Sequence, residues 1–498
     1  MLAGSLAVAA CGNGRPIVQA GNDVAEAPAT TLPAGSDGTT APGQTAAPTI
    51  APTTTATPLA DLPPCPVDAL DDVSDPVDIT FWHAMTGVLE DELVALTDAY
   101  NAGQSKVRVT LQNQGGYEQA LDKYLQSSQS SRPDIVQLPE YTVQVMVDTD
   151  STVPMSACIE ASSFDTSPIL PRILTAYATQ GVQWAMPFNV SDPVLYYNKR
   201  IFEAAGLDPE LPPVTLDDVR AASQAIVDAG AARYGIAFDT GFDSGGGWFV
   251  EQWLAKRAEL YADNENGRAA PATRVLYAAP PAFDLFTQVQ AMVQDGLAVN
   301  VGDNASGQDT FLKMADPTEA AAMTIATSAA LGTVLNVVQG GLIPGVTVDD
   351  IGVGPMPGPT EAPGALVGGG ALWMAADRPP EKTAAAWDYI RYLVSAESQA
   401  AWAAATGYVP IREDSIDLEP LATTYRNDPR FKVAYDQLTA SADNPATLGP
   451  VLGPLREVRA VTARGVANIM NGADVEVSLT ESAQQADALI ADYLIRNP

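Results

Sequence analysis

The sequence predicts an α/β fold in which helices cover a largely parallel β-sheet. From residue 77 onward, short strands with an apolar residue at every second position alternate with longer stretches whose apolar residues recur at helical spacing. Hydrophobic residues make up 46% of the 498-residue chain, which is enough for a large core. This length is typical of two or three domains. In such folds, ligands bind at the carboxyl ends of the strands.

The elements follow from these two periodicities. Alternating apolar residues predict strands at 77–81 and 107–111, and a short apolar run predicts a third at 135–138. Between the first two strands, apolar residues three or four positions apart predict a helix that ends at Gly103. The remaining patterns predict a strand at 194–197, a helix at 216–229, a buried strand, turn and short helix in 320–346, and a helix or helix pair at 384–405.

Composition excludes several functions. Sixty acidic residues against 26 Lys and Arg give a net charge of −34, which repels phosphate backbones and anionic membrane surfaces, so we expect no nucleic-acid partner. The chain has one histidine, which leaves almost no material for a histidine-based catalytic triad or a multi-histidine metal site. We therefore predict no metal and no cofactor.

The N-terminus has the pattern of an export signal followed by a tether. Residues 1–10 are short and apolar and end in small residues before Cys11, and this pattern resembles the end of a signal peptide with a bacterial lipobox. Residues 11–64 are rich in Thr, Pro and Ala, and they cannot bury enough apolar surface to fold, so they predict a disordered tether. We expect lipidated Cys11 to anchor the protein at the extracytoplasmic face of the cell membrane, with no other membrane contact.

Two further cysteines, Cys65 and Cys158, belong to the predicted folded part. In an oxidising exterior compartment such a pair is bonded more often than free. A disulfide between them would close a loop of about 90 residues and stabilise the fold by roughly 2–4 kcal/mol.

Several strings match one protein family in the same order along the chain. They are ITFWHAMTG at 79–87, GYEQ at 116–119, PFNVSDPVLYYNK at 187–199, GGGALW at 368–373 and TGYVPIR at 406–412. Together they resemble the carbohydrate-type solute-binding proteins of ABC importers, and most of all the sn-glycerol-3-phosphate-binding branch. The resemblance extends from about residue 77 to the C-terminus.

The resemblance implies a two-lobed, periplasmic-binding-protein-like clamp with a central cleft that closes on a ligand by hinge motion. We expect lobe 1 to comprise 65–187 with about 320–375, and lobe 2 to comprise 188–319 with about 376–498. It also implies a monomeric binding protein without enzymatic activity, which delivers a phosphorylated polyol or a sugar to the transmembrane subunits of an ABC permease.

The branch's ligand contacts fall on seven positions of this sequence: Tyr117, Glu140, Ser191, Thr327, Gly369, Tyr408 and Arg459. The resemblance implies that Arg459 is the main countercharge for a phosphate, because a guanidinium can take two phosphate oxygens. The hydroxyl groups would donate hydrogen bonds to phosphate, Gly369 would offer a backbone N–H, and Glu140 would accept from glycerol hydroxyls.

Three more residues are expected to shape the pocket. Leu216 stands where the branch can place a Trp against the ligand, and we hypothesise that its smaller side chain admits a larger phosphate substituent, as in glycerophosphocholine. Trp248 would then face a cationic headgroup. His83 is expected to be a structural histidine near the cleft.

Two other functions compete with this interpretation. The same fold could bind a neutral oligosaccharide, for which a buried cation such as Arg459 would contribute less. A secreted hydrolase with paired carboxylates is the third alternative, but the sequence contains no nucleophile elbow, no metal-ligand spacing and no phosphate-binding loop that leads into a helix. We therefore predict capture of sn-glycerol-3-phosphate or a glycerophosphodiester rather than catalysis.

Overall fold

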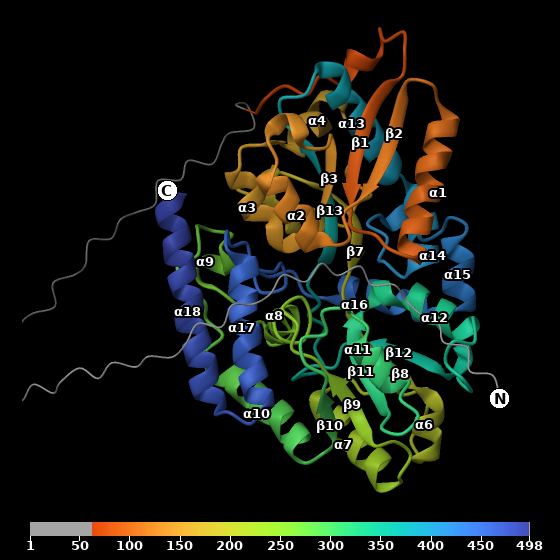
Figure 1. Cartoon of the computed structure of the whole chain (residues 1–498), viewed down its shortest axis with the longest axis vertical. Coiled ribbons are helices and arrows are strands. Elements are labelled where there is room, and N and C mark those ends of the chain that lie inside the picture. The colour runs from red at the N-terminus through yellow and green to blue at the C-terminus, as the bar shows by residue number, and fades with distance from the viewer. Residues whose placement is uncertain (1–61, 498) are drawn as a thin grey trace, which may run out of the picture. The chain divides into compact units, whose positions relative to one another are not determined.

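The structure, a computed structural model, describes residues 62–497. These residues form two lobes, each built around its own β-sheet with helices on both sides (Figure 1). The predicted signal peptide end (1–10), the lipidation site Cys11 and nearly all of the predicted tether (11–64) lie outside the described residues.

The first lobe contains a six-stranded sheet in the order β2-β1-β3-β13-β4, with β7 also paired to β13. Strand β1 is parallel to β2 and β3, whereas β13 runs antiparallel to its three partners. The strands are β1 (Val77–His83), β2 (Val107–Asn113), β3 (Ile135–Pro139), β4 (Thr152–Val153), β7 (Met186–Ser191) and β13 (Gly368–Ala375). A small hairpin, β5 (Ala178–Thr179) and β6 (Val182–Gln183), lies outside this sheet.

The second lobe contains a five-stranded sheet in the order β10-β9-β11-β8-β12. Strand β9 is parallel to β10 and β11, and β8 is antiparallel to β11 and β12. The strands are β8 (Pro193–Asn198), β9 (Tyr234–Phe238), β10 (Ala298–Asn300), β11 (Ala321–Thr327) and β12 (Ile351–Pro355). The predicted continuous apolar run at 194–197 is buried along all of β8, because the strand lies between two others.

Helices fill both sides of these sheets. In chain order they are α1 (Val88–Gly103), α2 (Tyr117–Gln126), α3 (Val143–Asp148), α4 (Met155–Ser162), α5 (Pro171–Ala176), α6 (Lys199–Ala204), α7 (Leu216–Asp228), α8 (Trp248–Ala255), α9 (Asp263–Asn266), α10 (Pro280–Gln294), α11 (Asp309–Met314), α12 (Leu331–Gln339), α13 (Pro380–Leu393), α14 (Ala396–Thr406), α15 (Leu421–Asn427), α16 (Val433–Ala440), α17 (Leu455–Met470) and α18 (Val475–Arg496). Single 3₁₀ turns connect several of them, including η4 (Glu140–Thr142), which follows β3.

Three connections join the lobes. Ser191 ends β7 in the first sheet, and two residues later Pro193 begins β8 in the second. Residues 356–367 lead back from β12 to β13. Residues 441–449 lie between the lobes, because Arg172 of α5 donates to the carbonyl oxygens of 441 and 442, while Arg268 of the second lobe donates to those of 448 and 449.

Two segments of the chain, 320–375 and 376–498, are divided between the lobes differently from the prediction. Residues 320–375 are predicted to belong to the first lobe, but β11 and β12 pair with β8 in the second sheet. Residues 376–498 are predicted to belong to the second lobe, but α13 and α14 pack on β1 and α1 of the first, whereas α17 and α18 belong to the second core. Strand pairing across more than a hundred residues leaves no local trace in the sequence, which explains the exchange.

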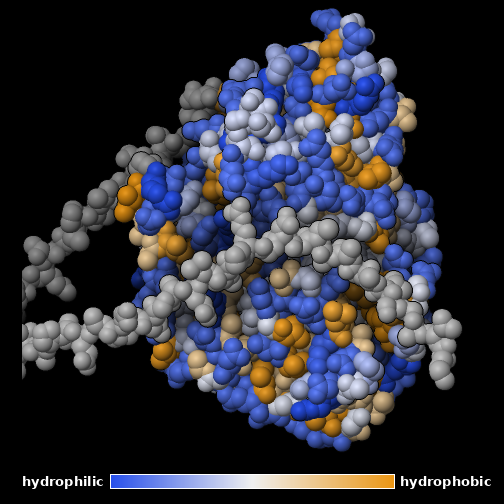
Figure 2. Space-filling view, in the orientation of Figure 1, coloured by the Kyte–Doolittle hydropathy of each residue, from blue (hydrophilic) through white to orange (hydrophobic). Residues whose placement is uncertain are grey.

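The sulfur atoms of Cys65 and Cys158 form a disulfide that links the start of the described chain to α4. Within residues 62–497, no helix is long and apolar enough to span a bilayer. Figure 2 shows that the visible face is mostly hydrophilic, with hydrophobic residues scattered over it. The most exposed large apolar side chains of the described residues are those of Leu211, Leu312, Leu342 and Ile495.

Candidate functional site

Three of the predicted ligand residues, Glu140, Ser191 and Thr327, lie at the ends of strands β3, β7 and β11. Five of the seven fall into two clusters. We call Tyr117, Asn189, Gly369, Gly370 and Tyr408 the tyrosine cluster, and Arg459, Glu140 and Glu251 the arginine cluster. The first belongs to the first lobe, and the second joins η4 of the first lobe to α8 and α17 of the second.

The tyrosine cluster is organised by Asn189, which is fully buried in β7. Its Nδ2 donates to Oη of Tyr117 over 2.6 Å. Tyr408 stacks on Trp402 with ring centroids 5.5 Å apart, and it hydrogen-bonds with Asn189 and Tyr117. Burial raises the pKa of the Tyr408 hydroxyl although those hydrogen bonds oppose the rise, so both phenols stay protonated at neutral pH.

Two glycines bring the backbone of β13 close to this cluster. Gly369 has φ +88°, and a Cβ atom there would lie 2.0 Å from the carbonyl oxygen of Asn189. A Cβ atom on Gly370 would lie 2.9 Å from Oδ1 of Asn189 and 3.0 Å from Oη of Tyr117. The register between β13 and β7 shifts at Gly370/Ala371. Such irregularities re-aim side chains and often accompany functional sites.

The arginine cluster is a buried ion triad. Nε and NH2 of Arg459 donate to the two carboxylate oxygens of Glu251 over 2.6 and 2.7 Å, and NH1 donates to Oε1 of Glu140 over 2.9 Å. The side chain of Arg459 is 2% exposed and that of Glu251 is 1% exposed. The guanidinium also lies over the ring of Tyr141, 5.3 Å from its centroid. Arg459 is therefore fully enclosed by partners that come from both lobes.

The charges of this triad offset one another. Burial raises the pKa values of Glu140 and Glu251, and the charge of Arg459 opposes that rise. Burial alone would lower the pKa of Arg459, but the two carboxylates outweigh it and raise that pKa. Arg459 is the predicted main countercharge for phosphate. In this structure its charge is already neutralised by Glu140 and Glu251, which leaves little net attraction for an additional anion.

Tyr177 connects the two clusters, and sequence reasoning missed it. Glu140 and Tyr408 both raise its pKa, so it lies within electrostatic reach of both clusters, although burial is the largest cause. Its hydroxyl is completely buried and has no hydrogen-bond partner among the described residues. The same holds for Nε1 of Trp248, whose ring lies against Gly368, because a Cβ there would be 2.2 Å from the indole. Both groups are donors without acceptors.

The other predicted residues contribute less to these clusters. Ser191 is buried at the end of β7, where its backbone pairs with Gly368. Thr327 ends β11 and its hydroxyl caps the following turn by accepting from the N–H of Ala329. His83 is 1% exposed at the end of β1, and burial lowers its pKa, which favours the neutral imidazole.

Leu216 is the first residue of α7. It is 1% exposed and packs within the apolar core of the second lobe. Widening of the pocket at this position stays a prediction.

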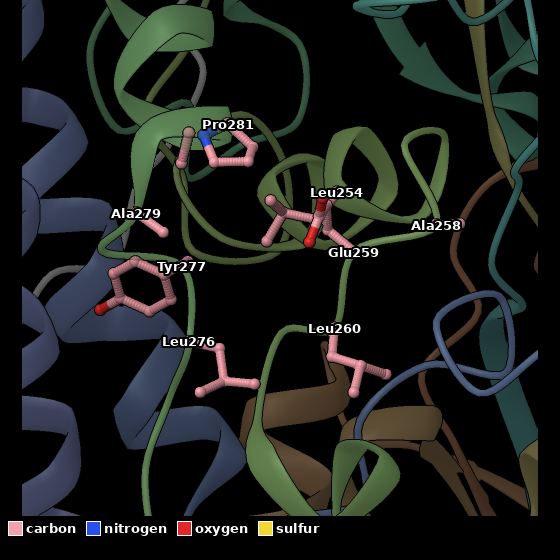
Figure 3. Close-up of a pocket in the computed structure, with 9 residues that line it drawn as sticks. Leu254, Ala258, Glu259, Leu260, Leu276, Tyr277, Ala279 and Pro281 are labelled. Carbon is pink, nitrogen blue, oxygen red and sulfur yellow. The ribbon is translucent and has the colours of Figure 1, made fainter.

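A separate cavity of about 270 Å³ lies in the second lobe, beside the end of α8 and the start of α10 (Figure 3). Leu254, Leu260, Leu276 and Tyr277 line it together with five smaller or charged residues. None of the predicted ligand residues lines this cavity.

Three polar residues that sequence reasoning missed hold the site together: Gln137, Asn189 and Glu251. Each is a polar side chain inside a mostly apolar string, IVQLP in β3, MPFNVS in β7 and WFVEQWLA in α8. A polar residue in a fully buried element needs a partner, and this signal could have identified all three.

Comparison with known proteins gives a consistent result. The chain is 27% identical to the sn-glycerol-3-phosphate-binding periplasmic protein UgpB of Yersinia pseudotuberculosis, over 84% of this chain and 93% of that protein. It is 27% identical to the protein of the same name from Escherichia coli, over 79% of this chain and 88% of that protein.

Solved structures share the fold. UgpB from Mycobacterium tuberculosis in complex with glycerophosphocholine superimposes with a TM-score of 0.69 at 21% identity, covering 85% of this chain and all (100%) of that one. The cyclic alpha-maltosyl-1,6-maltose binding protein from Arthrobacter globiformis gives a TM-score of 0.67 at 21% identity, with 84% and 100% coverage. The model of the bacterial extracellular solute-binding proteins matches residues 95–433, and the chain therefore belongs to this family.

Proposed function

We propose that the protein is the substrate-binding component of an ABC importer and captures sn-glycerol-3-phosphate or a glycerophosphodiester such as glycerophosphocholine. The name of the relatives and the ligand of the M. tuberculosis structure support this ligand class. Its partners are the transmembrane subunits of a permease.

One observation carries the proposal: two buried hydrogen-bond donors without acceptors belong to the region of the two clusters. The hydroxyl of Tyr177 and the indole N–H of Trp248 are both buried without a partner among the described residues. An unmade hydrogen bond of a buried group costs about 1–3 kcal/mol, so such groups call for an acceptor. A phosphorylated polyol carries several acceptor oxygens in a small volume, which suits this arrangement.

The phosphate is assigned to the tyrosine cluster rather than to Arg459. The guanidinium of Arg459 already serves two carboxylates, whereas Tyr117 and Tyr408 are protonated donors beside the open backbone of Gly369. Glu140 raises the pKa of Tyr177, as Tyr408 does, and its carboxylate can accept from hydroxyl groups of the glycerol part.

A neutral oligosaccharide is the second candidate. The neutralised Arg459 favours it, because a site without a free cation gains little from an anionic ligand. Solved relatives that bind maltose-type sugars have the same fold.

Calorimetric titration of the chain with sn-glycerol-3-phosphate, glycerophosphocholine and maltose decides between these ligands. We expect a Kd near micromolar, about −8 kcal/mol, for at least one phosphate ligand. We also expect binding to weaken at least tenfold in Tyr408→Phe and to stay unchanged in Tyr124→Phe, whose buried hydroxyl serves Ser151 instead. Heat with maltose alone would move the function to sugar uptake.

We further propose that the protein acts as a monomer, held by lipidated Cys11 at the extracytoplasmic face of the cell membrane. Its lipobox-like residues 8–11 support export and a lipid anchor. Metabolic labelling with a radioactive fatty acid tests the anchor, because label should enter the wild type and be absent from Cys11→Ser.

A further inference from the structure

A line of hydrogen bonds leads from the loop after β1 to the two tyrosines. The N–H of Ala84 donates to Oε1 of Gln137 over 3.0 Å, and Nε2 of Gln137 donates to Oδ1 of Asn189 over 2.8 Å. Nδ2 of Asn189 then donates to Oη of Tyr117 over 2.6 Å. Gln137 and Asn189 are both fully buried, so water does not compete for these bonds.

We call the hydrogen-bonded series Ala84, Gln137, Asn189 and Tyr117 the amide relay. The backbone N–H of Ala84 determines which group donates in every later hydrogen bond of this relay. A backbone N–H can only donate, so the oxygen of the Gln137 amide must face Ala84 and its NH₂ group must face Asn189. The oxygen of Asn189 must then accept, and its NH₂ group must face the tyrosines. Amide orientations are usually ambiguous, but here one main-chain proton determines both of them.

Because Asn189 donates to the Tyr117 oxygen, the tyrosine hydroxyls can act as hydrogen-bond donors to another group. Asn189 donates to Tyr117 and also hydrogen-bonds with Tyr408. Because Tyr117 accepts from Nδ2 of Asn189, its own hydroxyl proton points away from that nitrogen. Two phenols cannot both donate to each other, so the other proton of the pair goes either to the second lone pair of Asn189 Oδ1 or to an acceptor outside the cluster. Among the described residues, the hydroxyl of Tyr408 also donates to Sδ of Met85 over 4.0 Å, and this sulfur is a weak acceptor.

We infer that Gln137 and Asn189 are positioning residues that turn the hydroxyls of Tyr117 and Tyr408 into proton donors, so that this end of the site takes a ligand atom that only accepts, such as a phosphoryl oxygen. An ammonium group has no lone pair and is rejected here. In glycerophosphocholine the phosphodiester therefore faces the tyrosines and the choline points away. The inference rests on the proposed function for the identity of the ligand, but the relay itself lies within the chain.

Gly370 leaves room for the hydrogen bond between Asn189 and Tyr117. A side chain at this position would lie 2.9 Å from Oδ1 of Asn189 and 3.0 Å from Oη of Tyr117 and would force the two apart. The close passage of β13 therefore keeps the relay short and excludes water from it.

Binding of glycerophosphocholine to Asn189→Asp tests the direction of the relay. This diester is chosen because it lacks the second phosphate proton that titrates near pH 6 in monoesters. An ionised aspartate only accepts, so Tyr117 must donate to it and is lost to the ligand. We expect affinity at pH 8 to fall about tenfold to a hundredfold and to recover toward pH 5, where the protonated carboxyl can donate again.

A second variant tests the orientation of the Asn189 amide without adding the negative charge that Asn189→Asp introduces. Gln137→Met frees the Asn189 amide to turn without adding a charge, and we expect a loss of about threefold to tenfold that does not change with pH. Tyr124→Phe, which removes an equally buried hydroxyl of the first lobe, is the matched control and should bind as the wild type. Wild-type affinity in both Asn189→Asp and Gln137→Met at pH 8 would overturn the inference.

A neutron diffraction structure of the ligand-free wild type decides the relay without any ligand. We expect deuterium on the Asn189 nitrogen that faces Tyr117 and a Tyr117 hydroxyl deuterium directed away from Asn189. A Tyr117 deuterium pointing at Asn189 would overturn the inference even if glycerophosphocholine binds. If the deuterium atoms lie as expected and neither phosphate probe binds the wild type, the proposed ligand is wrong and the relay stands.

Discussion

Arg459 and Glu140 join the two lobes through one hydrogen bond of 2.9 Å, made between NH1 on helix α17 and Oε1 just after strand β3. The rest of the guanidinium is held within the second lobe by Glu251. Arg459 is thus fixed on one side and bridges the interface on the other. Opening the lobes would break the bond to Glu140 and leave the pair with Glu251 intact.

Removing Glu251 should destabilise the protein strongly. Glu251→Ala leaves a buried guanidinium with one carboxylate instead of two, and loss of one partner of a buried ion pair typically costs about 3–5 kcal/mol. Urea unfolding followed by circular dichroism measures the change. Glu457→Ala is the control, because Glu457 meets Arg456 on the surface and should contribute less than about 1 kcal/mol. Equal effects in the two variants would contradict the assignment of a buried triad.

Contacts at the rim of the interface should shift the balance between open and closed lobes. Oη of Tyr493 on α18 donates to Asp148 on α3 over 2.6 Å, which joins the second lobe to the first. Tyr493→Phe removes this bond, worth about 0.5–1.5 kcal/mol, so the Kd for ligand should rise roughly twofold to tenfold. Small-angle scattering should show a larger radius of gyration without ligand. Arg496→Gln, which breaks a pair within α18, should change neither quantity.

Gly369→Ala should abolish binding and weaken the fold. The alanine would adopt φ +88°, which L residues rarely tolerate, and its Cβ atom would lie 2.0 Å from the carbonyl oxygen of Asn189. We expect at least about 1–3 kcal/mol of destabilisation in thermal unfolding. Gly103→Ala is the matched control, because Gly103 ends α1 with open space around it. A Gly369→Ala protein with normal stability and affinity would mean that β13 can move away from β7.

The stability of the protein should depend on Lys256 in alkaline solution. Burial lowers the pKa of Lys256 from its ordinary value of 10.5 to about 8, although the nearby charge of Asp192 opposes this. Below pH 8 the ammonium is charged in both folded and unfolded protein, and the cost of burying it is fully present. Between pH 8 and 10.5 the unfolded chain binds more protons, so stability rises with pH as that cost is relieved.

Lys256→Met should therefore be more stable than the wild type at pH 7 by up to about 3 kcal/mol, with the advantage vanishing toward pH 10.5. The methionine keeps the apolar stem that packs on Gly358. Urea unfolding at a series of pH values gives both curves. Lys432→Met, at a more exposed ion pair, should show no gain that depends on pH. A constant difference across this range would show that packing, and not the buried charge, separates the proteins.

Local sequence patterns predicted the helices and strands well, but they predicted poorly which strands pair and which distant side chains meet. The strand at 194–197 and the helix that begins at Leu216 follow from the local pattern of apolar residues, and the structure adds a Thr215 cap to the helix. The pairing of β11 with β8 does not follow from that pattern, because it joins residues more than a hundred positions apart. For the same reason the sequence indicated Arg459 but could not reveal that Glu251, 208 residues earlier, neutralises it. Gln137 and Asn189 are polar residues in apolar strings, which is a local signal of a buried hydrogen bond. The structure was needed to show that Gln137 donates to Asn189 and that Asn189 donates to Tyr117.

The disulfide determines how force enters the molecule. It joins Cys65 to α4 of the first lobe, so a pull on the chain before residue 62 reaches that lobe directly. Such a pull reaches the second lobe through the three connecting segments and through contacts between the lobes, such as the hydrogen bonds of Arg459 with Glu140 and of Tyr493 with Asp148. The first lobe therefore takes up the pull before the contacts that hold the lobes closed.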